Sequence, residues 1–211
     1  RFLARTFPSI DNRLHVVPNG IDAAFVARCD AAGALATEPS HGVGDRVTLG
    51  TTSKMLRYEN LETLLRFCAA RPAVDLLFVG DGPERARLER LAAPLNAARR
   101  GRVRFTGQVP AERIPALLAT IDLFVVPRRE LAITRFASPI KVVEAMAAGR
   151  AIVASGVGDI ATLLADGCGE LVPPDDPTAL GAAIDTLAAN ETRRAELGER
   201  ARTRVATDYD G

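Results

Sequence analysis

The chain has no tryptophan and, among its 211 residues, only three cysteines, two histidines and two lysines. The cysteines, Cys29, Cys68 and Cys168, are odd in number, widely spaced and without a Cys-x-x-Cys pair. This pattern argues against a disulfide framework and a metal or redox motif, and it predicts reduced structural thiols in a reducing, cytoplasmic compartment. No apolar run approaches the roughly 18–20 residues that cross a bilayer, and the opening apolar stretch is too short for a signal peptide.

Charge and size indicate one compact domain without a bias toward nucleic acid. The formal net charge is +1, so we expect no nucleic-acid partner. With 47% hydrophobic residues, the chain has enough apolar side chains for one full core, or for one domain plus a tail. It begins with Arg1 rather than Met and is expected to be a piece of a longer protein.

Strand-like and helix-like segments alternate along the chain. Short apolar runs predict strands at Leu14–Val17, Val47–Leu49, Asp75–Val79, Val103–Thr106, Leu123–Val126, Ala151–Ala154 and Glu170–Val172. Segments of helical period are Leu61–Ala70, Glu84–Leu95, Ala111–Ala119, Ile140–Ala148, Ile160–Ala165, Pro177–Ala189 and Glu191–Ala206. Because the strands are apolar on both faces, the alternation predicts a Rossmann-like, doubly wound α/β domain with helices on both sides of a parallel sheet.

Residues at the ends of these segments support the boundaries. Asp176 followed by Pro177 predicts an N-cap with proline at the first helical position, and Ser138 followed by Pro139 repeats this pattern. Gly149 is placed to end its helix in a left-handed conformation. The segment 29–46 is rich in Ala, Gly, Pro and Ser without a period, and it is predicted to be a surface loop insertion.

Glycines follow three of the predicted strands at the edge of the sheet where ligands bind in this architecture. They are Gly50, Gly80 with Gly82, and Gly107. Glycine permits positive φ and close approach of a ligand to the backbone, although each turn alone is also compatible with a tight connection that binds nothing. The Gly80–Gly82 turn is not a dinucleotide motif, because Arg85 stands in the place of its third glycine, and no phosphate-loop motif is present.

The segment 138–149 carries the strongest functional signal. Its opening predicts a helix N-terminus whose backbone N–H groups suit a diphosphate; Pro139 removes one donor, and Ile140 and Lys141 keep theirs. The Lys141 side chain either adds a charge to that site or extends to solvent. Glu144 lies among apolar residues, where a carboxylate is costly unless it is paired or ligand-bound, and its oxygens suit two vicinal hydroxyls such as those of a ribose. An ordinary surface glutamate is the alternative.

Five motifs, in order, resemble the C-terminal domain of a GT-B-fold glycosyltransferase of the family 4, or group 1, type. Residues 17–22 (VPNGID) are similar to the PNGVD entry into that domain, 78–83 (FVGDGP) to its GDGP turn, and 105–109 (FTGQV) to its F-x-G-x-V turn. Residues 138–149 (SPIKVVEAMAAG) resemble its SP-[IL]-K-x-x-EAMA-x-G segment, and 171–177 (LVPPDDP) its LV-x-P-x-DP stretch. The resemblance covers nearly the whole chain from Leu14.

The resemblance implies a role for each matching position. Glu144 would hold the ribose hydroxyls, and the backbone from Ser138 to Lys141 would meet the diphosphate. The turns at Gly80 and at Gly107–Val109 would enclose the base and its neighbourhood. The implied donor-binding residues are Gly50, Thr51, Thr52, Lys54, Gly80, Gly82, Gly107, Val109, Arg128, Ser138, Pro139, Ile140, Lys141 and Glu144.

Three positions depart from the pattern of the family. Thr51, which with Thr52 would border the phosphates, stands where an Arg is usual, and Glu59 stands where a Lys is usual. Phe136 replaces a Glu that contacts the donor sugar in many members. The diphosphate charge would then fall to other cations, and the candidates are Lys54, Arg57, Arg128 and Arg135, with Arg128, at a strand end, favoured over Arg57.

The resemblance also implies a reaction and a division of the chain. A glycosyl group would move from a nucleotide-diphosphate sugar to an acceptor with retention, and helix N–H groups and cations would stabilise the leaving diphosphate without a metal or other cofactor. The acceptor site is expected on a missing N-terminal domain, so the fragment alone is expected to turn over little or nothing. Residues 1–13 would be an interdomain linker, 14–207 the donor domain, and 208–211 the start of a crossover segment.

Other interpretations stay open from the sequence alone. Nucleotide-sugar epimerases share the two-domain fold, although no convincing acid–base set is present, and a degenerate interaction module would explain Phe136, Thr51 and Glu59. His15 and His41 have no evident partner and are expected to have no catalytic role. The helix at 191–206 is predicted to be solvated, with a basic face for peripheral contact with anionic lipid. The base, sugar and acceptor are not determined by the sequence.

Overall fold

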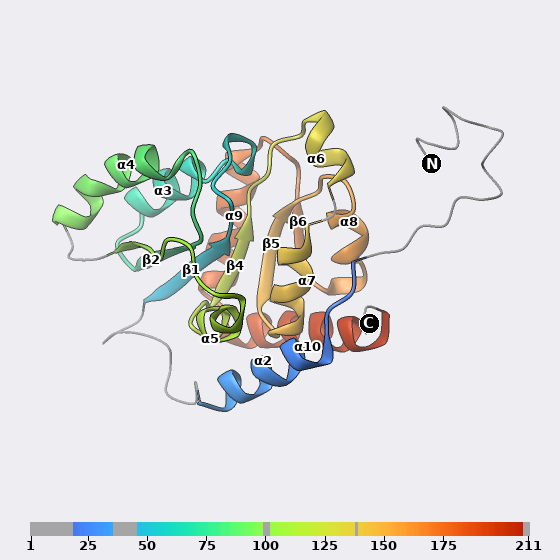
Figure 1. Cartoon of the computed structure of the whole chain (residues 1–211). Coiled ribbons are helices and arrows are strands. Elements are labelled where there is room, and N and C mark those ends of the chain that lie inside the picture. Colours follow the sequence, from blue (N-terminus) through green and yellow to red (C-terminus); the bar gives the residue numbers. More distant parts are fainter. Residues whose placement is uncertain (1–18, 36–45, 99–101, 138, 209–211) are drawn as a thin grey trace.

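A parallel six-stranded sheet forms the centre of the computed structural model, which describes residues 19–35, 46–98, 102–137 and 139–208 (Figure 1). Its strand order is β3-β2-β1-β4-β5-β6. The order reverses between β1 and β4, which is where open α/β sheets bind their ligands. The strands are β1 (Val47–Thr52), β2 (Val74–Val79), β3 (Val103–Phe105), β4 (Leu123–Val126), β5 (Ala151–Ser155) and β6 (Glu170–Val172).

Helices connect the strands and cover both faces of the sheet (Figure 1). The α-helices are α2 (Ala23–Leu35), α3 (Glu62–Ala69), α4 (Arg85–Ala98), α5 (Ile114–Ala119), α6 (Ala132–Phe136), α7 (Ile140–Ala147), α8 (Ile160–Leu163), α9 (Pro177–Ala188) and α10 (Glu191–Asp208). Short 3-10 turns are η2 (Arg57–Glu59), η3 (Ala111–Arg113) and η4 (Ala165–Gly167).

Alternate residues of each strand belong to two separate hydrophobic clusters. In β4, Phe124 and Val126 join the cluster formed with α2, α5, α7 and α8, whereas Leu123 and Val125 join the cluster formed with α3, α4 and α9. The four side chains are fully buried, because successive residues of a strand point to opposite faces and both faces are covered. The predicted doubly wound α/β fold is confirmed.

The predicted loop at 29–46 is wrong over its first part, because α2 runs from Ala23 to Leu35. Phe25 and Cys29, four residues apart, are both buried in the core, so one helical turn separates two contacts on the same face. The helical period is hidden when the segment is divided at Cys29, because the two buried residues then fall in different segments. Residues 36–45 and the predicted strand Leu14–Val17 lie outside the described residues, as do both histidines.

One predicted helix boundary shifts and two are confirmed. α7 begins at Ile140, so Pro139 is its N-cap and not its first helical residue; Ser138 lies outside the described residues. The Pro139 carbonyl accepts from the Val142 N–H at 2.9 Å. Asp176 caps α9 as predicted, accepting from the backbone N–H groups of residues 178 and 179 at 3.0 and 2.9 Å. Gly149, with φ 64°, ends α7 in the left-handed conformation.

α10 is solvated on one side only, which corrects the prediction of a solvated helix. Leu197, Ala201 and Val205 are buried at a spacing of four residues. Gly198 lies so close to the end of α7 that a Cβ there would come within 2.1 Å of the Gly149 carbonyl oxygen. Arg202 of α10 also forms an ion pair with Asp30 of α2, so α10 contacts a helix that is distant in sequence.

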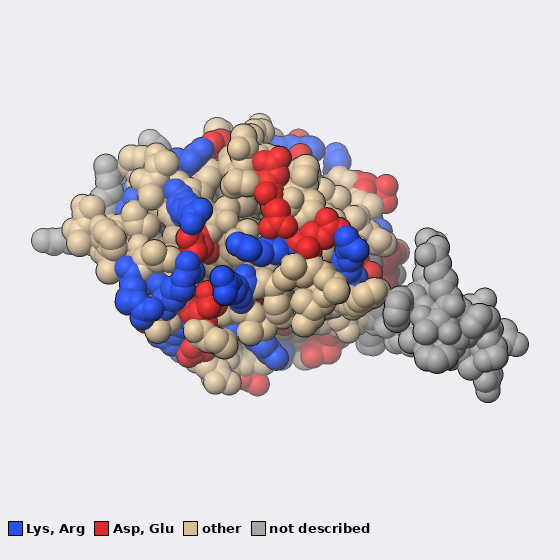
Figure 2. Space-filling view, turned by 90° about the horizontal axis from the view of Figure 1, so that it is seen from above, with Lys and Arg blue, Asp and Glu red and all other residues tan. Residues whose placement is uncertain are grey.

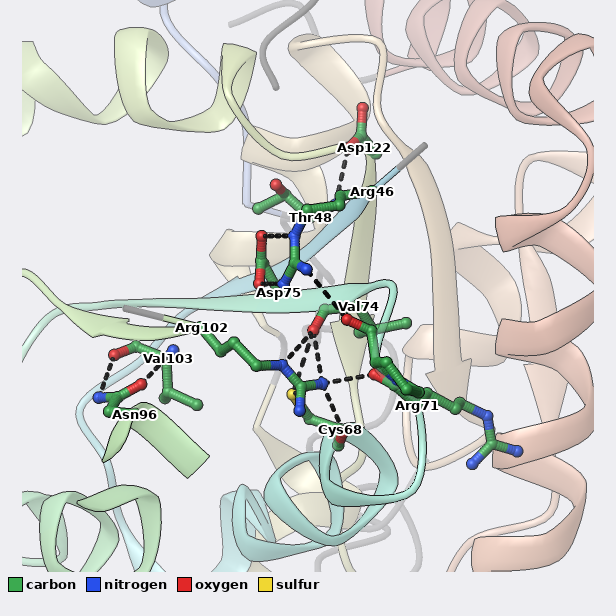
Figure 3. Close-up of polar contacts among 11 residues, drawn as sticks. Arg46, Thr48, Cys68, Arg71, Val74, Asp75, Asn96, Arg102, Val103 and Asp122 are labelled. Carbon is green, nitrogen blue, oxygen red and sulfur yellow. Dashed lines mark hydrogen bonds and ion pairs between the residues drawn. The ribbon is translucent and has the colours of Figure 1, made fainter. Parts of the chain in front are cut away.

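Polar contacts close the amino ends of the strands (Figure 3). The Arg46 Nε donates to Asp75 Oδ2 at 2.7 Å, and the Thr48 N–H donates to Asp122 Oδ2 at 2.7 Å, which ties β1 to its neighbours. The buried Arg102 guanidinium donates to the carbonyls of residues 68, 71 and 74. These polar groups serve the fold, so the opposite, carboxyl edge of the sheet is where a ligand site has to be sought.

Candidate functional site

A hollow of about 740 Å³ opens at the carboxyl edge of the sheet, bordered by the segments that follow β1, β2 and β3. This volume falls in the range of small-molecule sites, roughly 300–1,000 Å³. The structure brings five of the predicted donor-binding residues to its lining: Thr52, Lys54, Gly80, Gly82 and Val109. Figure 2, which views the molecule from above, shows Lys and Arg interspersed with Asp and Glu, rather than gathered by sign.

Gly80 and Gly82, in the turn after β2, leave no room for a side chain, because the backbone of the segment after β1 lies against them. A Cβ at Gly80, where φ is 119°, would lie 2.2 Å from the Ser53 carbonyl oxygen. A Cβ at Gly82 would lie 1.6 Å from the carbonyl oxygen of Lys54. These contacts are with backbone, which cannot move aside as the end of a side chain can. The glycines therefore set the shape of the hollow by allowing the β1 and β2 segments to interlock.

The predicted loop start at Gly50 is wrong, because β1 continues to Thr52. Gly50 makes room for the Ile121 side chain, which would lie 2.4 Å from a Cβ there. Thr51 is fully buried in the strand, and its hydroxyl lies 3.4 Å from the backbone oxygen of Thr52. Thr52 borders the hollow with a buried hydroxyl that has no hydrogen-bond partner among the described residues. Such a group is costly unless a ligand or water satisfies it.

Three buried charged side chains meet beside this edge: Glu59 of η2, Arg128 after β4, and Lys141 in the first turn of α7. Glu59 Oε1 accepts from Arg128 Nε at 3.1 Å and Nη2 at 2.9 Å, and Oε2 accepts from Lys141 Nζ. Arg128 Nη1 also donates to the Ala137 carbonyl at 3.3 Å. Arg128, the favoured candidate cation, and Lys141 thus lie together with Glu59 between them, and Lys141 does not extend to solvent.

Burial and neighbouring charges act in opposite directions on the ionisation of this cluster. Burial raises the pKa of Glu59, but the charge of Lys141 and the hydrogen bond and charge of Arg128 outweigh it, so the pKa lies below its ordinary value. Burial lowers the pKa of Lys141, and the attraction of Glu59 opposes that effect. The Arg128 guanidinium also lies 5.9 Å from the centre of the Tyr58 ring.

Glu144 lies one helical turn from Lys141 on the same side of α7, at a spacing of three residues. Glu144 is half-buried, its chain neighbours Val143 and Ala145 are buried, and its carboxyl makes no hydrogen bond within the described part of the chain. Burial raises its pKa, and the charge of Lys141 offsets part of that rise. A carboxylate held in this way favours a ligand that donates hydrogen bonds to it.

The remaining predicted residues are dispersed around this edge. Gly107 is buried with φ 71°, and its carbonyl accepts from the Gly80 N–H at 3.1 Å. Ile140 is 43% exposed, whereas Pro139 is buried. Arg135 forms a surface ion pair with Glu130, and Arg57 is exposed on η2.

Sequence reasoning noted Glu59 only as a departure and missed its role in this site. The signal available in the sequence was that a glutamate stands at position 59, where the family usually has a lysine. The distances in sequence between residues 59, 128 and 141 do not predict that they meet. Their contact arises because β1 and β4 are neighbours in the sheet.

Within the described ranges, no group of three or more His, Cys, Asp or Glu residues is placed to hold a metal ion. Among the described helices, none has the length and apolarity needed to cross a membrane. The three cysteines are free and buried, as predicted for structural thiols. Burial and the neighbouring Asp30 raise the pKa of the Cys29 thiol to about 11.

The sequence matches the family model for glycosyl transferases group 1 over residues 46–190. The match covers the strands, the hollow and the buried charged cluster. The chain belongs to the group 1 glycosyltransferase family. This family membership confirms the resemblance that the five motifs indicated.

Relatives of this group 1 glycosyltransferase chain are about twice its length. It is 31% identical to the GDP-mannose-dependent alpha-(1-6)-phosphatidylinositol monomannoside mannosyltransferase of Mycolicibacterium smegmatis, over 94% of the chain and 52% of the relative. Its structure is similar to that of sucrose-phosphate synthase from Thermosynechococcus elongatus, with a TM-score of 0.78, 27% identity, and coverage of 99% and 52%. It shares the fold of Anabaena HepE, solved with UDP and glucose, with a TM-score of 0.70, 23% identity, and coverage of 93% and 53%. The chain spans about half the length of these proteins.

Proposed function

We propose that this chain is the donor-binding half of a glycosyltransferase and that the hollow at the carboxyl edge receives a nucleotide-diphosphate sugar. The observation that carries the proposal is the buried Thr52 hydroxyl, which borders a hollow of nucleotide size and lacks a hydrogen-bond partner in the described part of the chain. The hollow lies beside the point where the strand order reverses, which supports the same assignment.

The proposed roles follow the chemistry of each part of the donor. The segments at Gly80–Gly82 and Gly107–Val109 border the base, and the half-buried Glu144 carboxylate accepts hydrogen bonds from the ribose hydroxyls. The first turn of α7, from Ile140, together with Lys141, faces the diphosphate through its N–H groups and positive charge. Lys54, exposed at the rim of the hollow, adds a further cation.

The whole protein would complete the reaction across a cleft. The acceptor hydroxyl would lie on an N-terminal domain, residues 1–13 would lead from it, and 14–207 would form the donor domain. The names of similar proteins include GDP-mannose and UDP as ligands, so both bases are candidates here. We propose transfer with retention, without a metal or other cofactor, by a cytoplasmic protein with peripheral membrane contact, and little or no turnover by the fragment alone.

Calorimetric titration of the purified chain tests this proposal. UDP, GDP, dTDP, ADP and their common sugar conjugates would be titrated into the wild type, into Glu144→Ala and into Glu199→Ala. Glu199 is an exposed glutamate on α10 and serves as the matched control. We expect saturable binding to one base that is lost in E144A and retained in E199A. Binding that is equal in both variants would contradict the proposed ribose contact.

Full-length protein provides the second part of the test. If neither the fragment nor the full-length protein binds any of these nucleotides, the donor-binding proposal is wrong and the domain is an interaction module. If only the full-length protein binds, the hollow needs the other half to be complete.

A further inference from the structure

The buried cluster of Glu59, Arg128 and Lys141 carries more positive than negative charge. The two cations and one carboxylate have side-chain exposures of 8%, 9% and 5%. Glu59 uses both oxygens on the cations, while Arg128 and Lys141 keep donors that the described contacts do not occupy. With Glu59 ionised and both cations protonated, these three residues carry a formal net charge of +1 in place of the +2 that the cations alone would have, and the nearby Glu144 also attracts Lys141.

We propose that Glu59 is an internal counter-anion that competes with the phosphate groups of a ligand for Arg128 and Lys141, and so limits how tightly the site holds phosphate. This inference rests in part on the proposed function, because it takes the donor's diphosphate as the competing anion. The carboxylate reaches the cations from η2, at the end of the segment that follows β1 and borders the hollow. A fixed negative charge at hydrogen-bond distance from both cations lowers the electrostatic gain available to any further anion.

The competition affects the product more than the donor. In the transfer, the bond between the anomeric carbon and the phosphate oxygen breaks, and its electron pair stays on that oxygen. The acceptor oxygen forms the new bond to the anomeric carbon, and its proton is released to water. The nucleoside diphosphate left behind carries more negative charge than the nucleotide sugar, so Glu59 weakens its binding further and favours its release.

Inorganic pyrophosphate is the direct probe of the charge balance. Its affinity would be measured at low ionic strength for the wild type, Glu59→Gln and the double variant E59Q/K141M, whose cluster again has a net charge of +1. We expect E59Q to bind pyrophosphate about tenfold more tightly than the wild type, with the gain shrinking as salt is added. The double variant is expected to return to within about threefold of the wild type, because its net charge is the same.

Nucleotides test the effect on product release. UDP would be compared with UDP-glucose, and GDP with GDP-mannose, in the wild type and E59Q. The affinity for the diphosphate product is expected to rise more than the affinity for the matching sugar conjugate. A further outcome is that uridine and guanosine nucleotides bind to neither the wild type nor E59Q while pyrophosphate still binds more tightly to E59Q. In that case the donor-binding proposal is wrong, but the role of Glu59 as a counter-anion is supported.

Unchanged or weaker pyrophosphate binding in folded E59Q would overturn the inference and would make Glu59 a structural bridge. Equal tightening for nucleoside diphosphate and sugar conjugate would overturn the effect on release. If E59Q does not fold in buffer, millimolar pyrophosphate should restore its far-UV circular dichroism, because the added anion replaces the carboxylate. Failure to restore the spectrum would also overturn the inference.

Discussion

At the scale of single residues, the carboxyl edge contains polar groups that the fold alone does not satisfy. Thr52 has an unpartnered buried hydroxyl among the described residues, and Glu144 is a half-buried carboxylate with a raised pKa. Groups of this kind lower stability and are typical of binding sites, where a ligand supplies the missing contacts. The amino edge differs, because the buried Arg102 there is bonded to backbone carbonyls (Figure 3).

Replacing Thr52 with Val should raise stability and weaken nucleotide binding at the same time. Valine has nearly the shape of threonine and removes the buried hydroxyl, whose unsatisfied burial costs roughly 1–3 kcal/mol. Denaturant unfolding and calorimetry would measure the two effects. A loss of stability with unchanged binding would mean that the hydroxyl has a structural partner.

Replacing Glu144 with Gln should stabilise the fold at neutral pH by roughly 0.5–2 kcal/mol, while nucleotide binding is lost. Because the pKa of Glu144 is raised in the folded protein, its ionisation penalty appears as the pH rises above the ordinary value of 4.5 and through the raised value. The gain in E144Q should therefore be present at pH 8 and absent near pH 4, as measured by urea unfolding at both pH values. A gain that is independent of pH would contradict this assignment.

Removing the charge of Glu59 should lower the free energy of unfolding by about 3–5 kcal/mol, because E59Q leaves two buried cations without a counter-charge. The folded pKa of Glu59 is below 4.5, so its stabilisation is present above that pH and is lost as the pH falls through the folded pKa. The difference between the wild type and E59Q should accordingly shrink in acid. Unfolding curves from pH 7 down to pH 3 would measure it, and a constant difference would exclude the ion pair as the cause.

At the scale of elements, close backbone contacts fix how the helices and loops pack. The β1 and β2 segments interlock at Gly80 and Gly82, and α10 crosses the end of α7 at Gly198. Each contact involves a backbone oxygen, so an added methyl group forces the elements apart. The hollow takes its shape from the first of these contacts.

Two glycine-to-alanine variants should change stability in opposite directions. Gly198→Ala places a methyl group within 2.1 Å of the Gly149 oxygen and is expected to cost at least 1–3 kcal/mol, a typical range for overpacking. Gly33→Ala, on α2 with nothing within 4 Å, should raise stability by roughly 0.5–1 kcal/mol, because alanine favours the helix. Thermal unfolding would compare them. Equal effects would show that α10 does not pack against α7 in this way.

The sequence was sufficient to predict the strands and most helices, because apolar runs and helical periods are local signals. The β6 bounds, Glu170–Val172, and the Asp176 cap agree with the structure. α2 was missed because its contacts with α5 and α10 are long-range, and its own segment shows only Phe25 and Cys29 as a stripe. The Glu59 contacts were also beyond prediction, since they need both the strand order and the rotamers of long side chains.

At the scale of the whole molecule, one edge of the sheet stabilises the fold and the other presents the site. The amino edge is closed by the contacts of Arg46, Arg102 and Asp122, whereas the carboxyl edge has the hollow. The family match spans both edges, but the chain spans only about half the length of its relatives. This difference between the two edges supports the proposal that the chain binds a nucleotide-sugar donor.

Amide chemical-shift mapping shows whether a nucleotide-sugar donor binds at the carboxyl edge of the sheet. UDP-glucose and GDP-mannose would each be titrated into the isotope-labelled chain, and shifts at the carboxyl edge would be compared with shifts at the amino edge. We expect one donor to perturb the amides of Lys54, Gly80, Gly82 and Val109, while those of Thr48, Asp75 and Val103 stay unchanged. Shifts confined to the amino edge, or absent with both donors in the full-length protein as well, would contradict it.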